Sequence, residues 1–303
     1  MNQISRHADK HPNVQSMQAA QAVKGRSLWD DARARLFANK AAVASMVILF
    51  LIVMAAIVWP AVSPVKYNDI NYSAYSVPPS AEYWMGTDTN GRDILVRTMM
   101  GARVSLAVGL IATMVSLVIG VLWGATAGFF GGTVDNVMMR IVDILYSLPF
   151  IFFVIILTVI FGTSLWIMFI AIGAIEWLTM ARIVRGQTLS LKEKEFVEAA
   201  RAIGVTPMTI VRRHIVPNLI GPVVIYVTLT IPYAILAESF LSFLGLGVQE
   251  PLTSWGVLIA DGANGVEAAP WALLFPAGVM ALTLFCFNFI GDGLRDALDP
   301  KDR

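Results

Sequence analysis

The sequence predicts an all-α integral membrane protein in which six membrane-spanning helices follow an amphipathic helix in the membrane interface. Of its 303 residues, 57% are hydrophobic and only 14% are charged, and its mean hydropathy is +0.68. A soluble domain of this length is less apolar. The apolar residues also gather in long uncharged runs, and about 20 such residues are needed to cross roughly 30 Å of hydrocarbon.

Two segments precede the first run. Residues 1–26 are polar without an apolar period, which predicts a disordered cytoplasmic tail, and no signal peptide is recognisable there. Residues 27–40 form the predicted amphipathic helix, with Ser27 and Asp30 as a capping pair. Its apolar side is opposite the basic side chains and consists of Leu28, Trp29, Ala32, Leu36 and Phe37. This pattern favours a helix lying in the interface over a solvated one.

The remaining chain, residues 41–303, is predicted to be one membrane domain. Its six expected spans are residues 41–59, 104–127, 138–161, 165–181, 219–237 and 271–290. Three prolines, Pro217, Pro222 and Pro232, lie in or beside the fifth span, and membrane helices tolerate proline where neighbours satisfy the freed carbonyls. An even number of spans places both termini on the same side.

Basic residues predict which side that is. Seven lysines and arginines precede the first span and seven more lie between Arg182 and Arg213, whereas residues 242–270 carry none. Because cytoplasmic loops are rich in these residues, we expect both termini and residues 182–218 to be cytoplasmic. Residues 60–103 are then outside despite four basic side chains, since long loops translocate largely regardless of charge.

The longest charged stretch between spans is residues 190–218. Ser190 and Glu193 form a capping box that predicts a helix starting at Leu191. Gly204 would end it, and Thr206 with Pro207 would begin the next. One apolar stripe is expected on the first helix, made by Phe196, Ala199, Ala200 and Ile203. The stretch is either a solvated helical loop or a docking element, with small residues admitting a partner and Glu198 offering a charge to an arginine.

Three motifs resemble one family. Glu198, Ala199, Ala200 and Gly204, with His214 to Asn218, are similar to the EAA signature of permease subunits of bacterial ATP-binding-cassette importers. The peptide and nickel branch of that family is resembled by GTD-x-x-GRD at residues 86–93, followed by Gly101, Arg103, Ser105 and Leu106, and by FLGLG at residues 243–247, followed by Pro251, Ser254, Trp255 and Gly256. The likeness extends from about Gly25 onward and is greatest to permeases that import oligopeptides.

The resemblance implies the fold of a type I importer permease in the bacterial inner membrane. It implies one subunit of an ATP-driven importer, forming half of the translocation pathway. The implied partners are a second homologous permease, two ATPase subunits, an extracytoplasmic binding protein, membrane lipid and a peptide. Residues 182–218 would be the coupling segment in a cleft of the ATPase, through Glu198, Ala199, Ala200, Gly204, His214 and Pro217. Dipeptides or nickel are the alternative cargoes.

Three carboxylates lie within or beside the spans. A carboxylate at the centre of a lone membrane helix costs about 2.5–3.5 kcal/mol on insertion scales, so Asp143 and Glu176 should face protein or water. Asp143, Glu176 and Glu238 are each candidates either for a bond between helices or for the pore. Glu238 is expected at the outer end of the fifth span, at an interface with water. In a second hypothesis the chain is a proton-coupled secondary transporter in which these three groups titrate.

Other chemistry finds little support. The sequence has no G-x-x-x-x-G-K-[ST] loop, so ATP and Mg²⁺ are expected on partner subunits, with no cofactor in this chain and no enzymatic activity of its own. His7 and His11 precede Pro12 and lack further ligands, and Cys286 stands alone. Glutamates among the basic residues of 190–218 argue against nucleic-acid binding. A membrane enzyme has no catalytic constellation to support it.

Overall fold

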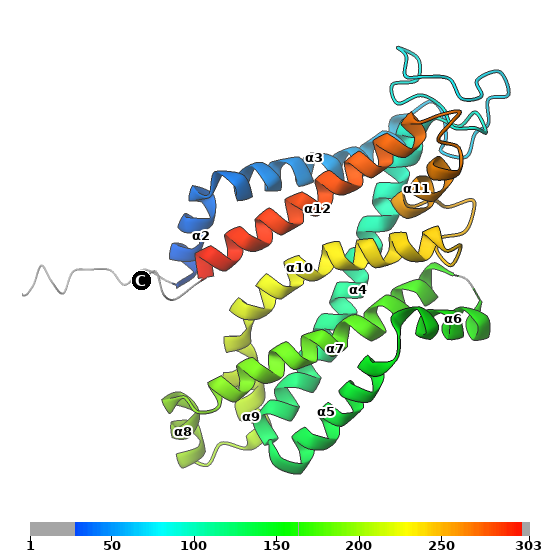
Figure 1. Cartoon of the computed structure of the whole chain (residues 1–303). Coiled ribbons are helices and arrows are strands. Elements are labelled where there is room, and N and C mark those ends of the chain that lie inside the picture. The colour runs from blue at the N-terminus through cyan, green and yellow to red at the C-terminus, as the bar shows by residue number, and fades with distance from the viewer. Residues whose placement is uncertain (1–27, 163, 299–303) are drawn as a thin grey trace, which may run out of the picture.

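The computed structural model of the chain is a bundle of helices (Figure 1) and describes residues 28–162 and 164–298. Within these ranges the regular elements are helical, apart from one isolated bridge between Thr87 and Asp93. The predicted tail 1–26, Ser27 of the predicted capping pair, Thr163 and residues 299–303 lie outside the described residues. The predicted all-α fold is confirmed.

Five helices are long and apolar enough to span a membrane, and a bent pair can supply a sixth span. The elements run in the order α2 (Leu28–Ala38), α3 (Lys40–Val62), α4 (Ile94–Phe130), α5 (Gly132–Ser147), α6 (Phe150–Phe161), α7 (Leu165–Leu191), α8 (Glu195–Ala202), α9 (Pro207–Ile210), the π-helical turn η1 (Val211–Ile215), α10 (Val216–Phe243), α11 (Trp255–Asn264) and α12 (Trp271–Leu298).

The first and last described helices lie together. Asn39 separates α2 from α3 and caps α3 by accepting the amide protons of Ala41 and Ala42. Ala42 in turn lies against Gly293 of α12, where an added Cβ would come within 2.6 Å of the Ala42 Cβ. The two ends of the described chain are therefore on one side of the bundle (Figure 1), as an even number of crossings requires.

The second span is longer than predicted. Asp93 caps α4 by accepting the Val96 amide, so the helix begins at Ile94 rather than near Val104. Hydropathy missed the first turns because Arg97 and Arg103 interrupt the apolar run, yet both are held by protein. Arg103 donates to the carbonyls of Ala56 and Ile57 in α3. The Ala56 carbonyl needs such a donor, because Pro60 lacks the N–H that would bond it.

A close crossing of α4 and α7 forms the centre of the bundle. Gly120, Gly124 and Gly128 recur every four residues and so lie along one face of α4. A Cβ on Gly124 would lie 2.4 Å from the Ala181 carbonyl oxygen, and one on Gly120 would lie 2.6 Å from the Met180 Cβ. Small residues at this spacing let membrane helices approach closely, and here they bring the two backbones together.

The predicted third span, residues 138–161, is not one helix. It is divided between α5 and α6, which meet at an angle of 85°. The cause is Pro149: Leu148 before it has an extended backbone, as residues before proline prefer, and proline contributes no amide proton to continue the ladder. The predicted outer loop 242–270 also differs, because it contains α11. The fifth span continues through Pro222 and Pro232 as α10.

Candidate functional site

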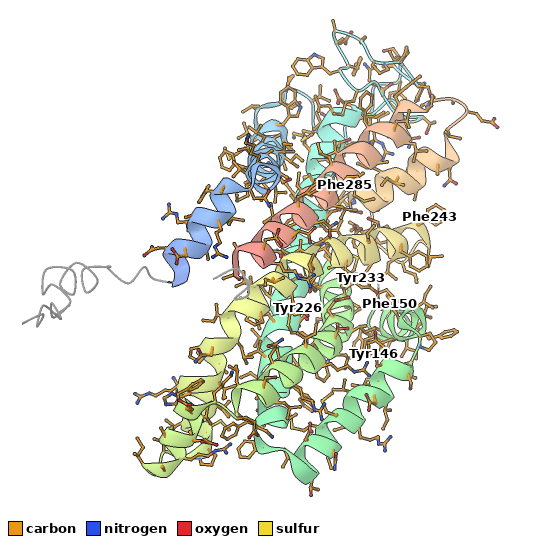
Figure 2. The ribbon with its side chains drawn as sticks, turned by 60° about the vertical axis from the view of Figure 1, so that its left-hand side comes forward. Tyr146, Phe150, Tyr226, Tyr233, Phe243 and Phe285 are labelled. Atoms are coloured by element: carbon orange, nitrogen blue, oxygen red, sulfur yellow. The ribbon has the colours of Figure 1, made fainter. Side chains whose placement is uncertain are left out.

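A cavity of about 590 Å³ lies where the α5–α6 bend faces α7 and α10. We call it the central cavity. Tyr146 and Phe150 come from the two sides of the bend, while Tyr226 and Tyr233 lie one above the other on α10 (Figure 2). The bend thus has a consequence for the site, because it brings an aromatic residue from each of its arms to one wall. Tyr146 and Tyr233 remain half-exposed, so the cavity is open on one side.

Glu176 of α7 lines this cavity. Its side chain is partly exposed and close enough to the Tyr233 phenol to interact with it electrostatically. No hydrogen bond or ion pair joins the Glu176 carboxylate to any other side chain in the part of the chain that the structure describes. The other predicted carboxylates lie elsewhere, so the structure does not bring the three together.

Asp143 belongs to an ion pair between helices. Its carboxylate accepts a 2.8 Å hydrogen bond from the Arg182 guanidinium of α7, which also lies 4.2 Å from the centre of the Tyr146 ring. A second pair joins the same two helices nearby: Arg185 donates two 2.6 Å hydrogen bonds to Asp135. Together these contacts fix α5 against α7. The Asp135 pair was not predicted, because the sequence gives no sign of which arginine and aspartate meet.

Glu238 is not at a water interface, which corrects the prediction. Its side chain is 0% exposed. The carboxylate accepts 2.6 Å hydrogen bonds from the hydroxyls of Ser242 and Ser254 and a 3.2 Å bond from Ser105. Ser254 also caps α11. A buried polar group must find such partners, and Glu238 thereby joins α4, α10 and α11.

The end of the bundle formed by α8, α9 and η1, here the α8 end, contains the predicted coupling residues. Glu198 and Ala199 are exposed on α8, whereas Ala200 is buried with Val197 against Ile210 and Ile215. Gly204 has φ +80°, the left-handed conformation expected of a helix end. The rings of His214 and Phe196 are tilted against each other with their centres 6.3 Å apart. Pro217 is exposed in the first turn of α10.

Two local predictions for this stretch are wrong. The Ser190–Glu193 capping box does not form, because α7 continues to Leu191 and α8 begins only at Glu195. The Ser190 hydroxyl instead lies 3.5 Å from the Gly186 carbonyl of its own helix. Thr206 precedes Pro207 at the start of α9, as predicted, but its hydroxyl lies 2.8 Å from the Thr209 hydroxyl and caps no amide.

The opposite end of the bundle, here the α11 end, comprises residues 63–93, the start of α4, the last turns of α10 from Glu238 onward, and residues 244–270 with α11 (Figure 1). Arg92 of the GRD motif donates a 2.7 Å hydrogen bond to Asp88 and a 2.9 Å bond to Glu250. Burial lowers the pKa of Arg92, but these two carboxylates outweigh burial and raise that pKa above its ordinary value. Arg97, 3% exposed, lies 3.7 Å from Asp88. The motif residues thus connect segments far apart in sequence.

Glycine explains other motif positions at this end. Gly91 has φ +75°, and a Cβ there would lie 2.2 Å from the Asn71 carbonyl oxygen. A Cβ on Gly247 would meet the Ser242 side chain at 1.9 Å.

In residues 28–162 and 164–298 no cluster of three His, Cys, Asp or Glu side chains could hold a metal ion.

A bundle of membrane-length helices around a cavity open on one side is the architecture of a membrane transport subunit. Residues 116–303 match the family described as binding-protein-dependent transport system inner membrane component. Residues 27–79 match the N-terminal TM domain of oligopeptide transport permease C. The chain belongs to the family of inner membrane permease components of binding-protein-dependent transport systems.

Curated relatives agree. The chain is 58% identical over 283 residues to Oligopeptide transport system permease protein OppC of Escherichia coli (strain K12), covering 93% of this chain and 94% of that protein. It is 56% identical over 283 residues to the protein of the same name from Haemophilus influenzae, covering 93% and 91%. It is also 44% identical over 294 residues to Dipeptide transport system permease protein DppC of Bacillus subtilis (strain 168), covering 96% and 92%.

A solved structure has the same fold. It shows inward facing conformations of the MetNI methionine ABC transporter, with 23% sequence identity and a TM-score of 0.55, covering 67% of this chain and 96% of that chain. At this identity the likeness concerns the fold, and it confirms the predicted importer permease architecture.

Proposed function

We propose that the chain is the membrane permease subunit of an ATP-driven oligopeptide importer and forms half of its translocation pathway. Its family and its relatives support the class. The observation that carries the proposal is the central cavity, because this chain encloses it on one side and leaves Tyr146 and Tyr233 half-exposed. A second, homologous permease facing this side would complete a passage for a peptide between the two subunits.

The motor in this proposal is provided by two ATPase subunits, which bind ATP and Mg²⁺. They dock on the α8 end, where Glu198 and Ala199 are exposed beside apolar side chains. Closure of the ATPase pair around ATP moves this end, and the attached helices rock between inward and outward openings. The α8 end is then cytoplasmic in the bacterial inner membrane, as are both termini. The α11 end faces the extracytoplasmic binding protein.

Reconstitution into liposomes tests this proposal. We expect uptake of a labelled peptide only when the chain is assembled with the sister permease, the two ATPases and loaded binding protein, and only with ATP inside. The proton-coupled alternative predicts uptake by this chain alone, driven by a pH gradient. Uptake by the lone chain, or full uptake by the complex without ATP, would contradict the proposal.

The cargo needs a separate experiment, because relatives named for oligopeptides and for dipeptides both cover most of the chain. Identity to the Escherichia coli and Haemophilus influenzae oligopeptide permeases, 58% and 56%, is higher than the 44% to the dipeptide permease, which favours longer peptides. We expect unlabelled peptides of three to five residues to compete with labelled uptake better than dipeptides or Ni²⁺ at equal concentration. Stronger competition by dipeptides or Ni²⁺ would shift the assignment to that cargo and leave the ATP-driven class unchanged.

A further inference from the structure

Glu176 of α7 differs from the acids of the neighbouring helices α5 and α10 in having no hydrogen-bond or ion-pair partner among the described residues. Asp135 is paired with Arg185, Asp143 is paired with Arg182, and Glu238 accepts hydrogen bonds from three serines. Within residues 28–162 and 164–298, Glu176 has no such bond. A carboxylate within a membrane helix costs about 2.5–3.5 kcal/mol on insertion scales and usually faces a partner or a water-filled cavity. The missing partner of Glu176 is therefore expected inside the central cavity.

The central cavity favours a cation. Glu176 is the one carboxylate among its lining residues, and no lysine, arginine or histidine lines it. Three tyrosines share the wall, two on α10 and one at the end of α5. Aromatic faces attract a cation within about 6 Å of the ring centre, and the phenol oxygens can accept hydrogen bonds from it. Carboxylate and rings thus offer complementary contacts to the same positive group.

The chain's own nearest guanidinium does not fill this role. Arg182 lies six positions beyond Glu176 on α7, which turns it to a different face of the helix. Its guanidinium is bonded to Asp143 at 2.8 Å and covers the Tyr146 ring at 4.2 Å. Glu176 thus stays available to a ligand, and the volume of about 590 Å³ is within the range of roughly 300–1,000 Å³ typical of small-molecule sites.

We propose that Glu176, with Tyr226 and Tyr233, forms a transient binding site for an ammonium group of the peptide in passage. This inference rests on the proposed function. The ammonium group is either the peptide's amino terminus or a lysine side chain, and the same carboxylate would receive both. The site gives the pathway a preference for cationic over anionic peptides, separate from selection by the binding protein.

The test compares uptake of three labelled tripeptides that differ only in a central lysine, norleucine or glutamate. Complete complexes in liposomes are supplied with saturating loaded binding protein, so that differences arise in the membrane. Glu176→Gln removes the charge and Glu176→Asp keeps it. Tyr233→Phe keeps a ring without the phenol. Glu267→Gln removes an exposed outer carboxylate as the matched control.

If the lysine side chain is the ligand, we expect Glu176→Gln to lower the lysine-to-glutamate uptake ratio by about tenfold, the order of a hydrogen bond to a charged group. If the amino terminus is the ligand, uptake of all three peptides should fall by that factor. Glu176→Asp should restore most of the lost uptake. Tyr233→Phe should cause a smaller loss, because it removes one oxygen acceptor and keeps the ring, and Glu267→Gln, outside the site, should change uptake little. A fall confined to the lysine peptide identifies the side chain as the ligand. Equal falls for all three peptides that Asp restores identify the amino terminus.

Two results would overturn the inference. In one, Glu176→Gln changes no uptake rate. In the other, Glu176→Gln and Glu176→Asp reduce the uptake of all three peptides equally, which is the behaviour of a residue needed only for packing. Either result leaves ATP-dependent uptake by the wild-type complex intact, so the proposed function would stand. Absence of uptake by that wild-type complex would instead reject the proposed function.

Discussion

The two ends of the bundle differ in which side chains find partners within the chain. At the α11 end, Arg92 binds Asp88 and Glu250, and Glu238 below it binds three serines. At the α8 end, apolar side chains remain in contact with solvent: Phe196 is 38% exposed, Met208 58% and Ile203 81%. Exposed apolar surface of this kind marks interaction sites. The α11 end is held together by its own buried polar contacts, although it too exposes apolar rings such as Tyr72 (76%) and Trp84 (63%). In the proposal above, a partner covers the apolar side chains of the α8 end.

This difference predicts opposite consequences of substitution. Removing the contacts of Glu238 or Arg92 at the α11 end should lower the stability of the chain itself. Changes at the α8 end should affect transport more than stability. Stability can be followed through Cys286, the single cysteine, which is buried in α12 and becomes reactive toward a thiol dye on unfolding.

The largest effect on transport is expected for Gly204→Val at the α8 end. Gly204 has φ +80° with no neighbouring atom within 4 Å of an added Cβ, so the cost comes from the backbone, about 1–2 kcal/mol for a side chain in the left-handed region. We expect uptake by the reconstituted complex to fall by about tenfold, with a modest fall in melting temperature that reflects this backbone cost. Gly204→Asn is the control, because asparagine tolerates this conformation. Equal losses in both variants would contradict the backbone explanation.

Glu238→Ala should be the most destabilising change at the α11 end. It removes the acceptor shared by Ser105, Ser242 and Ser254 and leaves a cavity, which predicts a loss of about 2–4 kcal/mol in the free energy of unfolding. Glu238→Gln retains an oxygen acceptor and most of the volume, so it should lose less than half as much. The melting curve of Cys286 reactivity measures both. Equal melting temperatures for Ala and wild type would show that the network contributes nothing.

Arg92→Gln should have an intermediate effect. Asp88, only 14% exposed, would lose its main partner, but Glu250 is 74% exposed and solvent replaces its bond. We expect a loss of about 1–2 kcal/mol, discounted for this exposure. Lys66→Gln removes an exposed charge from the same segment and should leave the melting curve unchanged. If Lys66→Gln destabilised the chain as much, net charge rather than the ion pairs would be responsible.

The smallest effect is expected for Asp261→Asn. Burial raises the pKa of the Asp261 carboxyl, and Arg97 and Arg92 only partly oppose this, while Asp88 and Glu250 raise the pKa further. An acid with a raised pKa in the folded state destabilises the fold once it is ionised. The asparagine variant should therefore be as stable as wild type or slightly more stable at pH 7. Its advantage should shrink as pH falls through the Asp261 pKa. A loss matching that of Arg92→Gln would contradict this.

The sequence predicted elements where one pattern dominates. Long apolar runs identified the spans, and Gly204 with Pro207 identified the corner at the α8 end. Prediction from the sequence was wrong where a distant group decides the outcome. Arg97 and Arg103 lower the hydropathy of the first turns of α4, and their partners lie elsewhere in the chain, so these turns were not recognised as part of the span. Pro149 and the glycines at 120, 124 and 128 are visible in the sequence. The bend and the close helix crossing that they allow depend also on the helices that pack against them.

The candidate site was predicted unevenly for the same reason. Glu176 could be selected as an acid in a span, but the tyrosines around it come from α5 and α10, and their convergence depends on the bend at Pro149. Glu238 was placed at water because its position at a helix end is visible in the sequence. Ser242 lies one helical turn from Glu238 on α10, but Ser105 and Ser254 come from other segments, and no spacing in the sequence reveals them.

The central claim, that a partner ATPase completes the α8 end, is tested most directly by crosslinking. Cys286 is first replaced by serine, and Ala199→Cys is then introduced on the exposed face of α8. In native membranes, with single cysteines placed along the cleft of each ATPase subunit, we predict a disulfide-linked product of the two subunits' combined mass, and none from Ser80→Cys at the α11 end. Failure of Ala199→Cys to crosslink with any position of either ATPase would contradict the account.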